Sequence, residues 1–138
     1  MSEATDLVTN LRFHQSWMII CQEYLSTDPT LPFDRFLRRM LEVEKESIEM
    51  VARALRLAGQ PPGSVSGNDE TATEARRRRT QSTRLQFIQV GLDRSVVWYQ
   101  VRLATPDDPH LDLWQPLYDR HAMLLAEIND LLGTAPTM

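Results

Sequence analysis

The sequence has little that would support disulfide or membrane chemistry. Its single cysteine, Cys21, cannot form an internal disulfide bond, and a reducing cytoplasm is the default location for such a chain. No apolar run approaches the roughly 20 residues that span a bilayer. Residues 1–10 lack a basic segment followed by an apolar core, so we expect no signal peptide. These absences predict a cytoplasmic protein with no membrane partner.

Familiar catalytic and nucleotide-binding signatures are missing as well. The sequence contains no glycine-rich phosphate loop, no nucleophile elbow and no CxxC pair. Its formal net charge of −4 argues against nonspecific binding to nucleic acid. The only dense basic run, residues 76–79, has no aromatic residue within it and follows several acidic residues. We interpret this run as a solvated helix overhang, so nucleic acid is not an expected partner.

What the sequence does contain is helical periodicity. Apolar side chains recur at spacings of three and four, which predicts amphipathic helices at about 5–26, 32–58, 71–104 and 110–132. A connection rich in Pro, Gly and Ser, residues 59–70, is expected to be flexible. Pro116 either kinks the last helix or begins its main part. No strand-like alternation stands out, so the prediction is an all-α, single-domain four-helix bundle spanning 1–138.

The lengths of the connections restrict the topology. Short links make the first two helices, and the last two, antiparallel hairpins. The link between the hairpins has about twelve residues, and at roughly 3.3 Å per residue it reaches about 40 Å. It can therefore just cross the bundle and make the second and third helices parallel. The alternative is a simple up-down-up-down bundle.

Polar residues occur at matching heights on the predicted apolar faces. Glu44 interrupts the apolar stripe of the second helix, and His14 and Glu44 lie fifteen residues on either side of residue 29 in the first turn. Asp93 and His121 lie fourteen residues on either side of residue 107 in the second. Because residues equidistant from a hairpin turn lie at one level, we expect one polar cluster in the core. A buried carboxylate needs such partners or a metal.

This pattern resembles the ferritin-like superfamily. That family binds metal with a carboxylate from helices one and three and a Glu-x-x-His pair from helices two and four. Here the second helix has Glu44-Lys45-Glu46-Ser47, with serine in place of histidine, and the fourth has Tyr118-Asp119-Arg120-His121, with tyrosine in place of glutamate. The resemblance covers the whole chain as an architecture and about half of the ligand motif. It implies a transition-metal site formed by His14, Glu44, Asp93 and His121, with Ser47 and Tyr118 as partners of the ligands.

Three interpretations of the four residues remain open. They form a buried hydrogen-bond network that fixes helix register, or a mononuclear Zn, Fe or Mn site, or the assumed helical phases are wrong and Asp93 in particular points to water. The corresponding functions are a non-catalytic binding or structural module that acts as a homo-oligomer, and a metal-dependent redox or hydrolytic protein.

Four aromatic residues lie off the main apolar stripes: Phe13, Trp17, Phe87 and Trp98. We expect them to be exposed on the lone bundle, because its single core cannot accommodate such wide apolar faces. A second copy of the chain would cover them by two-fold symmetry. The sequence therefore predicts a homodimer.

Overall fold

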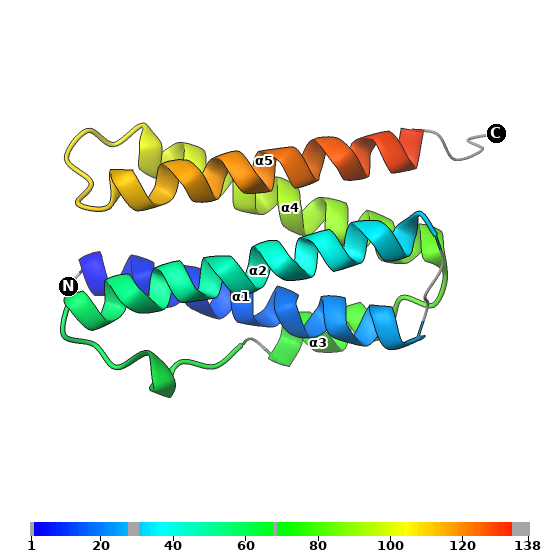
Figure 1. Cartoon of the computed structure of the whole chain (residues 1–138), viewed down its shortest axis with the longest axis horizontal. Coiled ribbons are helices and arrows are strands. Elements are labelled where there is room, and N and C mark those ends of the chain that lie inside the picture. The colour runs from blue at the N-terminus through cyan, green and yellow to red at the C-terminus, as the bar shows by residue number, and fades with distance from the viewer. Residues whose placement is uncertain (1, 28–30, 68, 134–138) are drawn as a thin grey trace.

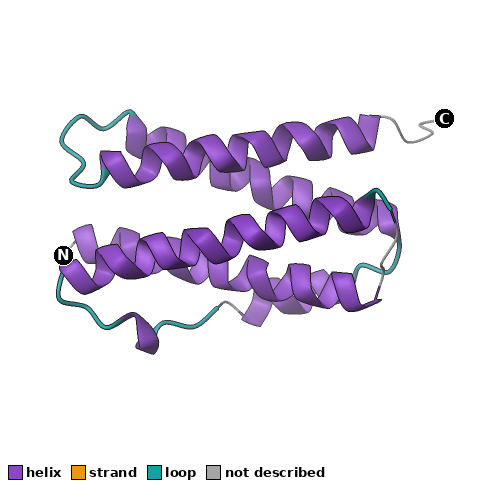
Figure 2. Ribbon diagram, in the orientation of Figure 1, coloured by secondary structure: helices purple, strands orange, loops and turns teal. Residues whose placement is uncertain are grey.

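The prediction of an all-α protein is confirmed. The structure, a computed structural model, describes residues 2–27, 31–67 and 69–133. These residues form no strand and comprise α1 (Ser2–Thr27), α2 (Phe33–Leu57), the 3-10 turn η1 (Pro62–Ser64), α3 (Asp69–Arg76), α4 (Gln81–Leu103) and α5 (Leu111–Gly133) (Figure 2). Among the described residues, no helix is both long and apolar enough to cross a membrane.

Four long helices lie side by side in two antiparallel pairs (Figure 1). α1 pairs with α2, α4 pairs with α5, and α2 lies against α5. In Figure 1 both α2 and α4 run from right to left, so the chain between them returns along the length of the bundle. That return segment carries η1 and the short helix α3, which packs on α1.

The core has two apolar clusters, one toward each end of the bundle. One combines the start of α1, the end of α2, the end of α4 and the start of α5; its buried members are Leu7, Leu11, Val51, Leu55, Tyr99, Trp114 and Leu117. The other uses the opposite halves of the same helices and includes Trp17, Phe36, Leu37, Leu92 and Ile128. The C-terminal halves of α2 and α4 belong to the same cluster. The packing of the core therefore agrees with Figure 1 that these two helices run in the same direction.

The predicted helix 71–104 is wrong, because the chain breaks into α3 and α4 between residues 76 and 81. Thr80 has an extended backbone, and its hydroxyl accepts a hydrogen bond from the Thr83 amide at 3.1 Å. The Thr83 hydroxyl accepts in return from the Thr80 amide at 3.2 Å. This reciprocal cap starts a new helix at residue 81.

The break lets α3 fold back onto α1. The Tyr24 hydroxyl donates to the Ala75 carbonyl at 2.7 Å, and Arg76 forms an ion pair with Glu23 at 2.8 Å. The basic run is therefore not an overhang, because its first arginine ties α3 to the end of α1. The connection 59–70, predicted to be flexible throughout, contains η1 and the first residues of α3.

Helix α5 begins before Pro116 and includes it. The amides of Leu113 and Trp114 both donate to the His110 carbonyl, and Asp108 accepts from the His110 amide at 2.8 Å. The alternative in which the main helix begins at Pro116 is thus wrong. Pro116 is inside the helix, in its second turn, so its missing N–H leaves one i→i−4 hydrogen bond of α5 unmade.

Candidate functional site

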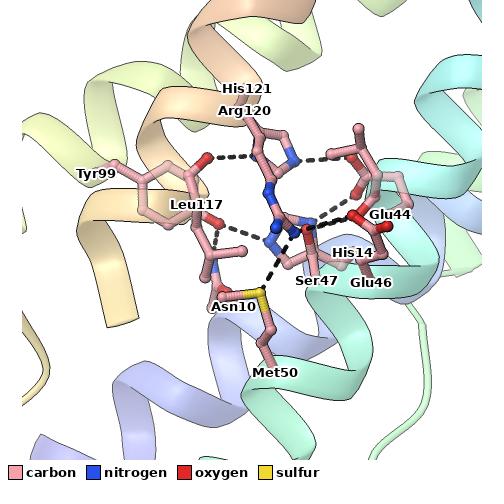
Figure 3. A network of polar contacts seen from close by, with 11 residues as sticks. Asn10, His14, Glu44, Glu46, Ser47, Met50, Tyr99, Leu117, Arg120 and His121 are labelled. Atoms are coloured by element: carbon pink, nitrogen blue, oxygen red, sulfur yellow. Dashed lines mark hydrogen bonds and ion pairs between the residues drawn. The ribbon is translucent and has the colours of Figure 1, made fainter. Parts of the chain in front are cut away.

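A polar cluster lies at the middle of the bundle, between the two apolar clusters. His14 on α1, Glu44 on α2 and His121 on α5 are each 0% exposed. The two imidazole rings lie side by side with centroids 4.8 Å apart, and the Glu44 carboxylate bridges them from one side (Figure 3). One of its oxygens is 2.6 Å from His14 Nδ1, and the other is 2.8 Å from His121 Nε2. Three of the four predicted residues therefore meet as expected.

The second ring nitrogen of each imidazole also has a hydrogen-bond partner. His121 Nδ1 lies 2.7 Å from the Leu117 carbonyl, one turn earlier on α5. His14 Nε2 lies 2.6 Å from the Tyr99 hydroxyl on α4, and this hydroxyl accepts a hydrogen bond from Asn10 Nδ2 at 3.0 Å. The cluster thus joins all four long helices at one level.

His121 and Glu44 form a buried ion pair. Both nitrogens of His121 face acceptors, a carbonyl and a carboxylate, so both carry protons and the ring is a cation. Burial acts to lower the pKa of His121, but Glu44 and the Leu117 carbonyl outweigh it and raise that pKa. Burial likewise acts to raise the pKa of Glu44, but the two histidines outweigh it and lower that pKa to about 2.

His14 is the neutral member of the cluster. Burial lowers the pKa of His14 and outweighs the opposing effect of Glu44. A neutral imidazole has one N–H, which His14 uses at Nδ1 to donate to the Glu44 carboxylate. Its Nε2 therefore accepts from the Tyr99 hydroxyl, which keeps its proton because burial raises the pKa of Tyr99. Every hydrogen bond of the cluster has a fixed direction.

Asp93 does not belong to this cluster, and the prediction for it is wrong. Its side chain is exposed, because the buried face of α4 runs through Ile88, Leu92, Ser95 and Tyr99. Helical side chains lean toward the N-terminus of their helix. Tyr99, six residues later than Asp93, can therefore extend its long ring back toward the middle of the bundle.

The two residues predicted to support the ligands have other contacts. The buried Ser47 hydroxyl donates to the Val43 carbonyl, one turn earlier on α2, at 2.7 Å. Tyr118 is half-buried and packs against the apolar cluster near the start of α5. The aromatic hydroxyl that reaches a histidine belongs to Tyr99. The sequence analysis also did not include Asn10 in the cluster. Its position four residues before His14, on the same face of the helix, could have predicted it.

Beside the cluster is a pocket of about 440 Å³ between α1, α3 and α4. Its aromatic lining consists of Phe13, Trp17, Phe87 and Trp98. Trp17 is only 3% exposed and the other three are half-buried, so the prediction of an exposed aromatic stripe is wrong. All four rings have ring contacts within the chain. The Trp17 centroid is 6.2 Å from that of Phe13 and 5.5 Å from that of Phe87, and Trp98 contacts Tyr99 and Trp114.

Gly91 forms part of the pocket wall and makes room for Trp17. A Cβ atom added to Gly91 would lie 2.1 Å from the Trp17 indole, well inside van der Waals contact. The indole therefore rests directly on the backbone of α4. It fills space between α1 and α4 that two ordinary helical side chains would otherwise share.

Fold and site together define an all-α bundle with a buried His–Glu–His cluster and an adjoining aromatic pocket. The chain matches no known protein-family model, no curated protein and no solved structure. Its function must therefore be argued from the site.

Proposed function

We propose that the chain is a non-catalytic binding module, a bundle of ferritin-like topology whose ligand occupies the pocket between α1, α3 and α4. The observation that carries this proposal is the pocket itself. Its volume of about 440 Å³ falls within the roughly 300–1,000 Å³ typical of small-molecule sites. Aromatic walls with a few polar groups are the usual lining of such sites.

The ferritin-like assignment has two supports. The return segment makes α2 and α4 parallel, as in that superfamily's arrangement of two hairpins joined by a long crossover. Each long helix also contributes at least one polar side chain to a cluster at the middle of the bundle. In this proposal the cluster fixes helix register and supports the pocket wall, since all four ring nitrogens and both carboxylate oxygens already have partners.

The first prediction concerns an apolar probe. N-phenyl-1-naphthylamine, whose fluorescence rises in apolar surroundings, is expected to bind at about one molecule per chain. Val90→Trp is expected to weaken that binding about tenfold, because Val90 lines the pocket and a larger side chain there occupies ligand space. Fluorescence titration with dilution calorimetry measures both quantities.

Val97→Trp is the matched control. Val97 is on the same helix and is 48% exposed, against 49% for Val90, but it is not part of the pocket lining. Its substitution is expected to leave probe affinity within twofold of the wild type. Equal weakening by both variants, or no binding to the wild type, would contradict the pocket as the binding site.

A metal site is the second candidate, and one observation favours it. Donor atoms of His14, Glu44 and His121 all lie within 4.8 Å of one another. Imidazole nitrogens with a carboxylate suit Zn, Fe or Mn, and Tyr99 and Leu117 would hold the two rings in place. The fit is partial, because the 2.6 and 2.8 Å contacts are hydrogen bonds whose protons a metal must displace.

Metal analysis distinguishes the two candidates. For protein purified without an affinity tag or chelator, we expect well under one metal ion per chain. We also expect no rise in the thermal midpoint on adding Zn²⁺ or Mn²⁺, since binding to the folded state alone would stabilise it. Stoichiometric metal that is lost in His121→Gln would instead support the metal-dependent function.

Self-association remains a prediction, on different grounds from the aromatic residues. Helix α4 exposes Val90, Val97 and Val101, each about half accessible. A second copy packed along α4 would cover them. We expect light scattering to give twice the chain mass, and Val97→Lys to lower it without loss of helical circular dichroism. A wild-type mass of one chain at 100 µM would rule this interface out.

A further inference from the structure

The exposed face of α4 carries far fewer charges than the exposed face of α2. Each helix has ten exposed residues. On α2 nine of the ten are charged, whereas on α4 only Asp93 and Arg94 are charged and three are valines. A surface depleted in charge and enriched in apolar side chains is typical of the centre of a protein interface. The face of α4 therefore has the composition of a contact surface.

The three valines form one stripe along α4. Val90, Val97 and Val101 are 49%, 48% and 52% exposed, and we call them the valine stripe. Their spacings of seven and four residues are those of the seam along which two helices pack in a coiled coil. The stripe therefore fits a second helix that carries a seam of the same kind.

Asp93 and Arg94 lie on opposite sides of the valine stripe. They follow Val90 by three and four residues, so their side chains point about 100° apart around the helix. Arg94 lines the pocket, on the side of α1 and α3. Asp93 is on the side of α5, together with Gln89, whose amide donates to Asn129 of α5 at 2.6 Å. Among the described residues, neither Asp93 nor Arg94 has an ion-pair partner.

These two charges favour one orientation of a second copy. A two-fold axis parallel to α4 brings the Arg94 side of one helix against the Asp93 side of the other. The two residues are neighbours in sequence, so they lie at nearly the same height and both ion pairs form at once. An antiparallel pair instead brings each side of the helix against the same side of its copy. Opposite charges then do not meet.

We propose that two copies of the chain associate through their valine stripes as a parallel two-fold pair, with each Asp93 paired to Arg94 of the other copy. This inference rests on the self-association included in the proposed function, and it adds the orientation and register of the partner. Its charges are self-complementary, which favours a second copy over an unrelated helix.

Cysteine cross-linking tests the orientation. Val90→Cys and Val101→Cys are each expected to give a disulfide-linked dimer on mild oxidation, because parallel pairing in register places each position beside its own copy. The two positions are about 16 Å apart along the helix, so an antiparallel pair can bring at most one of them beside its own copy. The wild type is the control, since its one cysteine, Cys21, is buried. Non-reducing electrophoresis measures the linked fraction.

Charge reversal tests the ion pairs. Asp93→Arg is expected to weaken dimerisation about tenfold, because it places two arginines together on both sides of the axis. Adding Arg94→Asp to this variant exchanges the charges and should restore the dissociation constant to within about threefold of the wild type. Glu42→Arg makes the same change of charge at an exposed position on α2 and should leave the constant within about twofold. Sedimentation equilibrium measures each constant.

The outcomes separate this inference from the proposals on which it rests. A wild-type dimer in which only one of the two cysteine variants cross-links, or neither, overturns the parallel orientation and leaves self-association in place. A double variant as weak as Asp93→Arg alone overturns the ion pairs and with them the proposed register. A wild-type chain that stays monomeric overturns self-association and this inference together, while binding of N-phenyl-1-naphthylamine still decides the pocket independently.

Discussion

Glu44→Ala is expected to lower the free energy of unfolding by about 3–5 kcal/mol, because the buried His121 then either stays a cation without its counter-charge or gives up its proton and leaves Nε2 without a partner. The same substitution removes the acceptor of His14 Nδ1 and opens a small void in the core. Both partners are fully buried, so water cannot take the place of the carboxylate without rearrangement. Urea unfolding at pH 7, followed by circular dichroism, measures the change.

Two controls separate this effect from a general loss of helix stability. Glu44→Gln keeps the shape, and its amide can accept from His14 and donate to a neutral His121, so we expect less than half the loss. Glu46→Ala removes an exposed carboxylate on the same helix that pairs with Arg120 at 3.0 Å. Such surface pairs contribute about 0–1 kcal/mol. A loss for Glu44→Ala no larger than for Glu46→Ala would show that the cluster does not stabilise the fold.

Acid is expected to remove about 3 kcal/mol of stability through Glu44 alone. Its pKa falls from 4.5 to about 2 on folding, and each unit corresponds to about 1.36 kcal/mol. Because the folded-state pKa is the lower one, the unfolded state takes up the proton first. The contribution is therefore complete above pH 4.5 and is lost as the pH falls from 4.5 toward 2.

Near neutral pH, the contributions of the two histidines to the free energy of unfolding change in opposite directions with pH. The raised pKa of His121 gives a contribution that is present below 6.5 and is lost as the pH rises through its folded-state pKa. The lowered pKa of His14 works the other way, since the unfolded state takes up a proton first as the pH falls below 6.5. The free energy of unfolding is therefore expected to change most steeply in the acid range, where Glu44 titrates.

The free energy of unfolding, measured at several pH values between 7 and 2.5, checks this dependence. Other carboxylates also titrate in this range, so the quantity to follow is the difference between the wild type and Glu44→Gln. That difference should shrink as the pH falls from 4.5. A difference that stays constant over the whole range would mean that Glu44 is not held as a buried anion.

Most of the fold was predictable because it depends on local patterns. Spacings of three and four placed α1, α2 and α5 within a few residues of their observed ends. The break before α4 was not predicted, since a cap formed by Thr80 and Thr83 lies within a polar run that is equally compatible with a continuous helix. The sequence Thr71-Ala72-Thr73-Glu74 has the residue pattern of a capping box, but it lies inside α3 rather than before it.

The site was predictable only where counting along the helices suffices. His14 and Glu44 are on neighbouring helices joined by a short turn, so equal distances from that turn bring them together. On α4, side-chain length and direction determine which residue joins the polar cluster. They place the Tyr99 hydroxyl in the cluster and leave Asp93 outside it. The pocket depends on α3 folding back over α1, and no pattern in the sequence predicted that contact.

The indole of Trp17 resting on Gly91 has a consequence for evolution. Neither residue can change freely alone, because any side chain at position 91 would occupy the space of the indole. Distant relatives that keep this pocket are therefore expected to share the pattern Asn-x3-His-x2-Trp on the first helix and Gly-x7-Tyr on α4. Relatives with a larger residue at position 91 should have a smaller one at position 17, and the two positions should vary together.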